Sequence, residues 1–600
     1  RENQETAALF GELAANGIHV VAEKNHWKDL TRGFGGLRSA GGWKMLKFKI
    51  AFITASLLLC AALTTAAPAP DVTEQQQRAR QQETEQQNRV EAPSVMTGTE
   101  KTDEAENPWE LPAEKDRMQV DTFVIDDGGK GFQWLKRELK PYEHQQIGPK
   151  GLSLLAEKLN TRLKQRGFIT SQVILPEQNI AGKYVVFQVL PGYIEEIKFA
   201  DNEKYGTWRN AFPCAPGDIL NVYDLDQGLE QMKQVPYQNV KMNLEPGTEP
   251  GKSIVILEVT RVKPWSLGIS WDDSGLAATG KHQGAVHFSV YNPTGLNDVL
   301  SVSGAHDTER RDTFGTKNYS FYYSIPWRKY SFSVSHHYSE YEQEVPALLP
   351  YTQQSKNSSW EFGVQRLLYR DRKSRTQFIG KILHRHKRNY LNHEEIKVQE
   401  LQTTAYQIGV NHRHYIGTGM IDALVYYQKG IPILGAMPGL DDHNPAYMTT
   451  RYEMWGWNLY YGTPFRCFGA EARYKFVMRG QYTPNMLYSA DHFSIGGRYT
   501  VKGFSGANTL AAENGYVIKN EVGFPLRKSH IEPYIGVDYG RTWGASDAFN
   551  LGKALAGAYL GIRGKISGLS FDAFIGTPLD KPKGFKADKT ACGFSLYWEF

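Results

Sequence analysis

The chain has 600 residues, enough for several domains, and its formal net charge of +5 is too small for this length to indicate a nucleic-acid-binding protein. Its 33 Tyr, 28 Phe, 13 Trp and 57 Gly are typical of an antiparallel β-protein, including one that forms a barrel in a membrane. Only three of the four Cys lie outside the apolar segment around residue 60. Because three widely separated cysteines cannot all pair, the chain is no disulfide scaffold, and at most one bridge is expected.

The start of the chain predicts an export signal rather than a folded domain. Residues 45–67 contain two lysines, an apolar run at 50–63 and a small residue for cleavage at Ala67, which is the layout of a secretory signal peptide. The apolar run is shorter than the roughly 20 residues that a membrane-spanning helix needs. Residues 1–44 precede the methionine that would start this signal, and we interpret them as a non-native N-terminal extension.

A polar helix and a linker are predicted next. Residues 68–91 consist largely of Gln, Glu and Arg, which are good helix formers, and they show no apolar stripe. Such a helix either bridges through solvent or lies inside a polar cavity. Residues 92–117 contain three prolines among Thr, Glu and Gly, which predicts a flexible linker.

Two consecutive small α+β units follow, at residues 118–200 and 201–264. The first has a strand, a helix that ends near Gly167 and two further strands. The second repeats this order with a helix that begins near Asp224 and a closing strand. The helix of the first unit places four leucines on one face: Leu152, Leu155, Leu159 and Leu163.

From residue 265 to 600, apolar residues alternate with small or polar ones, as in "YSFYYSI" at 319–325. This period of two fits a soluble sandwich or a transmembrane barrel. The export signal, the aromatic-rich apolar faces and an alternating C-terminal strand favour the barrel, because strands in lipid must close into a ring to pair their backbone groups. At about 20 residues for each strand with its connection, about 16 strands are expected. The C-terminal strand carries its apolar side chains at Phe594, Leu596, Trp598 and Phe600.

The sequence contains no pattern that indicates catalysis, a nucleotide or another cofactor. Two H-x-H pairs, His384/His386 and His412/His414, have a spacing that could hold a metal on a strand. Both pairs lie among Arg and Lys, which repel a cation, so we interpret them as polar lumen or loop residues. We therefore predict no enzyme, no cofactor and no metal.

One stretch, "RYTVKGFSG" at 498–506, fits neither a good strand nor an ordinary loop. It is rich in glycine, yet it holds two apolar residues and a lysine: its central residues are Val501, Lys502, Gly503 and Phe504. Further along, Asp538 shares a strand face with Gly536 and Gly540, which leave smooth wall beside the carboxylate. Asp538 is either an ordinary hydrated lumen residue or an ion-pair partner for Lys502.

Several motifs in order give the chain a resemblance to a known family. They are "RGFITSQVILPEQNI", "GDILNVYDLDQGLEQMKQVP", "WDDSGLAATGKHQG", "YNPTGLNDVLSVS", "LLYRDRKSRT" and "FSIGGRYTVKGFSGANTLAAENGYVIKNEVGFPL". Over residues 71–600 the chain resembles the outer-membrane transporters of two-partner secretion, the TpsB class of hemolysin-activator and filamentous-hemagglutinin exporters. The resemblance implies a 16-stranded barrel at 265–600, two periplasmic POTRA domains at 118–200 and 201–264, and a lumen-plugging helix at 68–91.

The resemblance also implies residue roles. A loop of the family folds back into the barrel with a V-R-G-[FY] motif, and Lys502 stands where that motif has arginine. The inner-wall aspartate that pairs with this arginine falls on Asp538. Because an ammonium lacks the bidentate geometry of a guanidinium, we expect a looser loop anchor here.

The implied function is a pore in the bacterial outer membrane that exports one large exoprotein (an adhesin, a cytolysin or a contact-dependent toxin) without nucleotide hydrolysis. The lipid bilayer and the outer-membrane assembly machinery, which would read the C-terminal strand, are further expected partners, and nucleic acid is not. We hypothesise that the leucine-bearing helix of the first unit and a strand edge beside it form a groove that captures the exoprotein by β-augmentation. The alternatives are an outer-membrane barrel assembly factor and a passive porin or receptor.

Overall fold

The computed structural model describes residues 70–600, with gaps at 93, 95–109, 180–181, 201–205, 310–314, 346–349, 440, 443, 445 and 527–528. The predicted extension at 1–44 and signal peptide at 45–67 therefore lie outside the described residues, as do the start of the predicted helix segment and most of the predicted linker. Within the described part of the chain, no helix combines the length and the apolar character that a membrane span requires.

The first α+β unit is built around a three-stranded sheet in the order β2-β5-β4, in which β2 runs parallel and β4 antiparallel to β5. Its helix α6 begins at Pro149, where the Glu114 carboxylate accepts hydrogen bonds from the N–H groups of Lys150 (2.9 Å) and Gly151 (2.8 Å). The helices and strands of this unit are β1 (Met118–Val120), β2 (Thr122–Asp126), η2 (Gln133–Leu135), α5 (Lys136–Leu139), η3 (Lys140–Tyr142), β3 (Gln145–Ile147), α6 (Pro149–Gln165), β4 (Gln172–Ile174) and β5 (Tyr184–Leu190).

The leucines of α6 form the core of this unit and do not line a groove. All four are at most 2% exposed and pack in one cluster with residues of the sheet such as Phe123 and Phe187. The prediction that Leu152, Leu155, Leu159 and Leu163 line a substrate groove is therefore wrong. An apolar helical stripe marks the face that is buried on folding, and here the unit's own sheet covers it.

The second α+β unit repeats the design with a sheet in the order β6-β8-β7, β6 parallel and β7 antiparallel to β8. Its helix α7 is capped by Asn221, whose side chain accepts a hydrogen bond from the N–H of Tyr223 at 2.9 Å. The elements are β6 (Tyr193–Phe199), α7 (Val222–Lys233), β7 (Gln238–Pro246) and β8 (Lys252–Arg261). The repeat of architecture that the sequence predicts is thus present in the structure.

Sixteen strands of the described chain close an antiparallel barrel, in which β27 pairs with β9 (Trp598 opposite Ile269). A two-residue strand, β16 (Glu394–Glu395), only extends the hairpin that β15 begins. The sixteen are β9 (Trp265–Asp272), β10 (Gln283–Tyr291), β11 (Val299–Asp307), β12 (Gly315–Trp327), β13 (Tyr330–Val345), β14 (Tyr351–Arg370), β15 (Ser374–Leu391), β17 (Leu401–Ile416), β18 (Gly419–Gly430), β19 (Glu453–Cys467), β20 (Ala470–Tyr482), β23 (Asn514–Gly523), β24 (Ile531–Trp543), β25 (Ala554–Ile566), β26 (Leu569–Asp580) and β27 (Ala591–Glu599).

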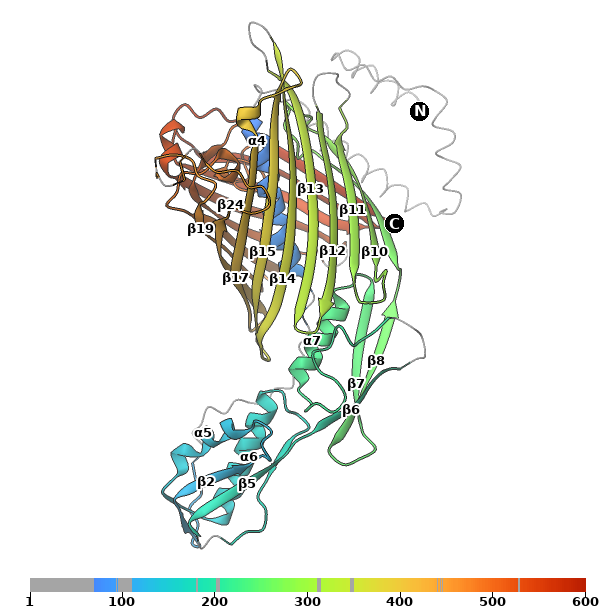
Figure 1. Cartoon of the computed structure of the whole chain (residues 1–600), viewed down its shortest axis with the longest axis vertical. Helices are drawn as coiled ribbons and strands as arrows, with labels where there is room; N and C mark the ends of the chain where they lie inside the picture. The colour runs from blue at the N-terminus through green and yellow to red at the C-terminus, as the bar shows by residue number, and fades with distance from the viewer. Residues whose placement is uncertain are drawn as a thin grey trace. The chain divides into compact units, whose positions relative to one another are not determined.

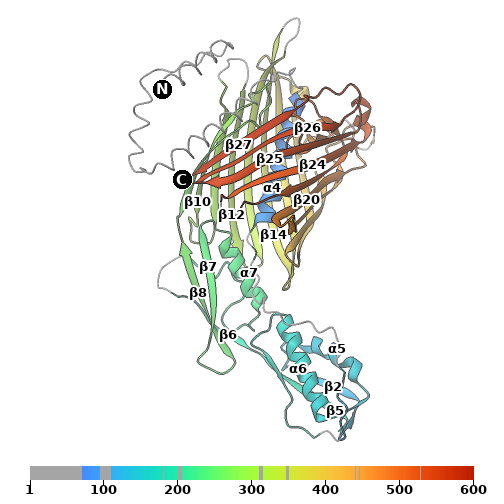
Figure 2. The same ribbon diagram turned by 180° about the vertical axis from the view of Figure 1, so that it is seen from behind.

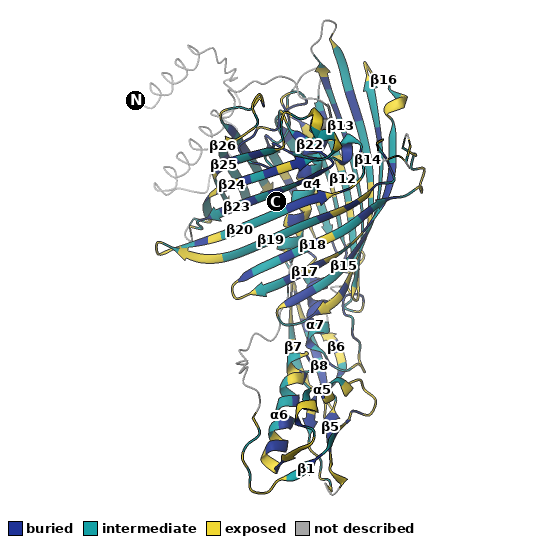
Figure 3. Cartoon of the chain, turned by 90° about the vertical axis from the view of Figure 1, so that its left-hand side faces the viewer, coloured by how far each residue is buried: buried dark blue, intermediate teal, exposed yellow. Residues whose placement is uncertain are grey.

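The barrel strands carry apolar side chains outward and polar ones inward. On β24, Ile535 and Val537 are exposed on the outer face. Asp538, the next residue, faces inward and is completely buried. Figure 3 shows buried, intermediate and exposed residues following one another along the barrel strands. An apolar exterior with a polar interior is the inverse of a soluble protein and is what a barrel in lipid requires.

Two segments of the described chain lie in the barrel interior. Helix α4 (Pro70–Glu91), blue in Figure 1, lies between the front and back walls of the barrel, and the view from behind in Figure 2 shows it again behind strands β20 to β27. The connection between β20 and β23, residues 483–513, is the inward loop. It contains η6 (Ser489–Asp491) and a two-stranded sheet of β21 (Phe493–Ile495) and β22 (Leu510–Ala512). Two further short helices, η5 (Lys397–Gln399) and η7 (Ala545–Phe549), lie in other connections.

Candidate functional site

Helix α4 is held in the barrel by charged side chains along its length. Its carboxylates and guanidinium groups meet opposite charges on strands from several sides of the wall and on the inward loop. The pairs are Glu74 with Lys387, Arg78 with Asp491 (3.6 Å), Arg80 with Asp272 (3.1 Å), Glu83 with Lys519 (2.9 Å), Glu85 with Lys381 (3.2 Å) and Arg89 with Asp422 (2.7 Å). A helix without an apolar stripe is therefore buried in a polar cavity, one of the two surroundings that its composition predicts.

The helix also packs directly on the inward loop. The amide of Gln76 lies between Gly497 and Gly506 and donates a hydrogen bond to the Gly506 carbonyl oxygen at 3.0 Å. A Cβ atom at Gly497 would lie 2.6 Å from the Gln76 Nε2 atom, so only glycine leaves room for the amide there. Helix and loop thus share one surface inside the barrel.

The tip of the inward loop lies flat on the barrel wall. Val501 and Phe504 are buried, and the Phe504 ring meets that of Phe585 edge-on with centroids 6.0 Å apart. Gly503 has a φ of +110°, which lets the chain reverse at the tip. In the structure the glycine-rich stretch thus forms the tip of the inward loop, with its two apolar side chains buried.

Two wall glycines that sequence reasoning missed make this approach possible. A Cβ at Gly557 on β25 would lie 2.0 Å from the carbonyl oxygen of Lys502, and one at Gly576 on β26 would lie 2.9 Å from the Gly503 Cα. Of the two glycines that were predicted, Gly540 does face the loop, at Val501, whereas Gly536 lies under the ring of Tyr559. The sequence does mark Gly557, because it stands in the alternating run "ALAGAYLGIRG", and a glycine within a strand often marks a close approach of another backbone.

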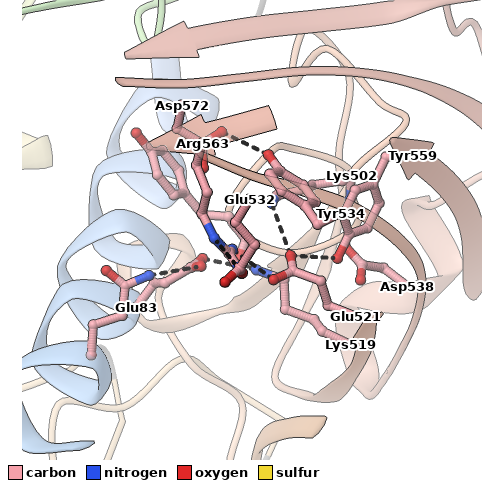
Figure 4. A network of polar contacts seen from close by, with 12 residues as sticks. Glu83, Lys502, Lys519, Glu521, Glu532, Tyr534, Asp538, Tyr559, Arg563 and Asp572 are labelled. Atoms are coloured by element: carbon pink, nitrogen blue, oxygen red, sulfur yellow. Dashed lines mark hydrogen bonds and ion pairs between the residues drawn. The ribbon is translucent and has the colours of Figure 1, made fainter. Parts of the chain in front are cut away.

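The structure brings Lys502 and Asp538 together, but not as an ion pair. The backbone N–H of Lys502 donates to Asp538 Oδ2 at 2.9 Å, while the Lys502 ammonium lies 3.8 Å from Glu521 Oε2 (Figure 4). The predicted contact between the ammonium and the Asp538 carboxylate is thus corrected to a backbone contact. The physical reason is the glycine wall, which lets the loop backbone come close enough to use its own N–H.

The Lys502 ammonium instead occupies a cage of aromatic rings. It lies 4.5 Å from the ring centroid of Tyr559, 5.2 Å from that of Tyr534 and 5.3 Å from that of Phe574. Ring faces attract a cation, and the attraction is stronger where water is excluded. Glu521 completes the cage and also accepts from Arg563 at 2.7 Å, so the carboxylate is shared between two cations.

A second anchor, four residues before Lys502, fixes the loop to the seam where the barrel closes. Arg498 donates to Asp273 Oδ1 at 2.7 Å, and the same oxygen accepts the N–H of Phe594 on β27 at 2.8 Å. Arg498 also donates to the Phe594 carbonyl oxygen at 3.3 Å. This anchor was not predicted, although both residues stand in motifs that carry the family resemblance.

A cavity of about 670 Å³ lies beside the C-terminal half of α4, against strands β19 to β26. Its lining includes Glu83, Glu91, Lys475, Lys519, Glu532 and Arg563. The two predicted histidine pairs lie elsewhere: His384 hydrogen bonds to Thr404 and His412 to Thr376, both at 2.9 Å. In the described part of the chain, no cluster of three or more His, Cys, Asp or Glu residues could hold a metal.

Comparison with known proteins decides which class of barrel this is. A family model described as "Haemolysin secretion/activation protein ShlB/FhaC/HecB" matches residues 251–564, and POTRA models match residues 130–192 and 193–246. The chain is also 34% identical over 551 residues to the outer membrane transporter CdiB-2 of Burkholderia pseudomallei (strain 1026b), which covers 88% of this chain and 94% of that protein. The chain belongs to the haemolysin secretion/activation family.

Other relatives agree. The hemolysin transporter protein HpmB of Proteus mirabilis is 27% identical over 67% of this chain and 72% of its own length. The solved structure of CdiB from Acinetobacter baumannii covers 90% of this chain and all of its own, with 25% identity and a TM-score of 0.79. The predicted family and fold class are confirmed: a 16-stranded transmembrane barrel preceded by a helix and two POTRA domains. The chain is a two-partner secretion transporter of the outer membrane, with its POTRA domains in the periplasm.

Proposed function

We propose that this transporter exports a single large exoprotein, an adhesin, a cytolysin or a contact-dependent toxin, which enters the lumen after helix α4 leaves it. The observation that carries the proposal is that α4 lies in the lumen and is held there by hydrogen bonds and ion pairs along its length. The partly exposed ion pair of Lys381 with Glu85 contributes only about 0–1 kcal/mol, whereas pairs such as Arg89 with Asp422 are largely buried and are costly to break singly. Because its surface is Gln, Glu and Arg, α4 stays soluble once it is outside.

We further propose that the exoprotein binds to the sheet edge of the first POTRA domain. Strand β2 is an edge strand of that sheet, and its Val124 side chain is 40% exposed, unlike the leucines of α6. An extended segment that adds to such an edge gains main-chain hydrogen bonds without a preformed pocket. The exported chain then folds outside the cell, which makes its return unfavourable and replaces nucleotide hydrolysis as the driving force.

Secretion of the partner exoprotein into the medium tests both proposals. A strain without the transporter should retain the exoprotein in the cell, and exoprotein in the medium of that strain would refute the export function. Val124→Lys should lower secretion at least tenfold with normal barrel abundance, whereas Val262→Lys, a control at another exposed POTRA position, should secrete normally. Normal secretion by Val124→Lys would refute the capture site and leave the export function standing.

The C-terminal residues Phe594, Leu596, Trp598 and Phe600 are proposed to be the segment that the outer-membrane assembly machinery reads. The rings of Trp598 and Phe600 stack with centroids 5.4 Å apart, and both side chains are about half exposed at the end of β27. Replacing both rings by alanine should lower the amount of assembled barrel in the outer membrane. An unchanged amount would refute this role.

A further inference from the structure

The carboxylate of Asp538 has a hydrogen bond at only one of its two oxygens. Oδ2 accepts the N–H of Lys502, while Oδ1 has no hydrogen-bond partner among the described residues, and the side chain is 0% exposed. A buried carboxylate oxygen without a donor is unfavourable, because it has lost its water and gained nothing in exchange. Such an oxygen gains a favourable interaction when a donor moves to within hydrogen-bond distance.

An ammonium stands next to this oxygen but is engaged elsewhere. Lys519 on β23 is directly opposite Asp538 on β24, a position where Cβ atoms are about 4.5–5.5 Å apart. Its Nζ atom donates instead to Glu83 Oε2 of helix α4 at 2.9 Å and to the carbonyl oxygen of Tyr499 in the inward loop at 3.4 Å. Figure 4 shows Lys519 between the helix and the loop anchor. One side chain therefore contacts the plug and the loop at once.

We propose that Lys519 exchanges Glu83 for Asp538 when α4 leaves the lumen, and that this exchange loosens the inward loop. The inference rests on the proposed exit of α4. Once Glu83 is gone, the Lys519 ammonium has a carbonyl oxygen as its remaining partner, and the Asp538 carboxylate across the strand pair is the stronger acceptor. The other nearby carboxylate, Glu521, is already shared by Arg563 and Lys502.

The exchange weakens the loop in two ways. Lys519 withdraws its hydrogen bond from the Tyr499 carbonyl, and its positive charge beside the Asp538 carboxylate weakens that carboxylate as an acceptor for the Lys502 N–H. The loop is therefore held firmly only while the plug is present, and plug departure precedes loop movement. Lys519 is a positioning residue in this scheme, since it acts through Asp538 and need not touch the exported chain.

Two measurements on the full-length transporter in detergent or bilayers test the scheme. Channel conductance reports the departure of α4, and amide hydrogen exchange of the peptide that contains the Lys502 N–H reports loop docking. Glu83→Gln, which keeps the shape of the helix side chain but removes its charge, should raise the open fraction and speed exchange of that peptide about tenfold. Lys519→Met should abolish this effect of Glu83→Gln on exchange, and Lys519→Arg should preserve it.

The outcomes separate this inference from the function on which it rests. The switch of Lys519 from Glu83 to Asp538 is refuted, and the plug model stands, in either of two cases. In the first, Glu83→Gln raises conductance but leaves hydrogen exchange of the loop peptide unchanged. In the second, Glu83→Gln speeds this hydrogen exchange equally in the wild-type and the Lys519→Met backgrounds. If Glu83→Gln and a second plug variant, Glu85→Gln, both leave conductance unchanged, the exit of α4 itself is refuted. A purely structural role of Lys519 predicts additive effects, which the double variant would reveal.

Discussion

Replacing Gly557 by alanine should undock the tip of the inward loop. The added Cβ would lie 2.0 Å from the Lys502 carbonyl oxygen and 3.4 Å from the Gly503 Cα. Both are backbone atoms, so no side chain can rotate away to relieve the overlap. The tip has to retreat from the wall by at least about 1 Å to restore an ordinary contact distance.

The cost of this retreat follows from the bond that it breaks. The Lys502 N–H donates to the buried Asp538 carboxylate at 2.9 Å, and a hydrogen bond to a charged group contributes about 1.5–3 kcal/mol. At 1.4 kcal/mol for each factor of ten, the docked fraction of the loop should fall roughly 10- to 150-fold relative to the undocked fraction. Val501 would lose packing as well, so this is a lower bound.

Hydrogen exchange of the loop-tip peptide and secretion of the exoprotein would be measured together. The control is Gly304→Ala on β11, where the nearest atoms to an added Cβ are 3.5 and 3.6 Å away on the Tyr319 ring. The control should behave like the wild-type chain, whereas Gly557→Ala should exchange faster and secrete less. Wild-type exchange and secretion in Gly557→Ala would refute the argument that the wall glycine docks the loop.

Three further outcomes follow from the same structure. Lys502→Ala should impair secretion less than Asp538→Ala, because alanine keeps the N–H that Asp538 binds. Lys502→Arg should secrete at least normally. Equal losses of secretion in the two alanine variants would contradict the backbone contact. Gly497→Ala should push the Gln76 amide off the loop, and the lost hydrogen bond should destabilise the docked helix by about 1 kcal/mol. The open fraction in conductance recordings should then rise about fivefold. In a Gln76→Ala background, Gly497→Ala should have no further effect. Burial raises the pKa of the Cys214 thiol to about 12. Maleimide at pH 8 should therefore label Cys214 about 10³-fold more slowly than the half-buried Cys467 at the end of β19. Comparable labelling rates would show that the core of the second POTRA domain opens.

The barrel strands and the two α+β units were predictable because they depend on local periodicity, and the family resemblance identified the units as POTRA domains. Alternation places Ile535 and Val537 outward and Asp538 inward whatever their neighbours are, and a strand has only two faces. The composition of α4 limited its surroundings to solvent or a polar cavity, and the family resemblance selected the cavity. The information in the periodicity and the composition lies within a short window of sequence, whereas the resemblance uses motifs spread over residues 71–600.

The partners of individual atoms were not predictable, because they depend on segments far apart in the chain. The contact of Lys502 with Asp538 through its backbone requires Gly557 and Gly576, which lie on two other strands. The aromatic cage likewise gathers rings from β24, β25 and β26. The error over Leu155 and its neighbours has another cause: periodicity shows that a face is buried, and it does not show by what.

The cage and the backbone contact together explain how lysine can stand where the family motif has arginine. The expected loose anchor assumed that the side chain at 502 binds Asp538, where a guanidinium would have the advantage of bidentate geometry. In this structure the N–H of the same residue binds Asp538, and any residue except proline supplies that donor. The side chain is left to satisfy Glu521 and three ring faces, a site that suits a compact ammonium. Position 502 can therefore exchange one cation for another, whereas Asp538 and Gly557 cannot change without releasing the loop.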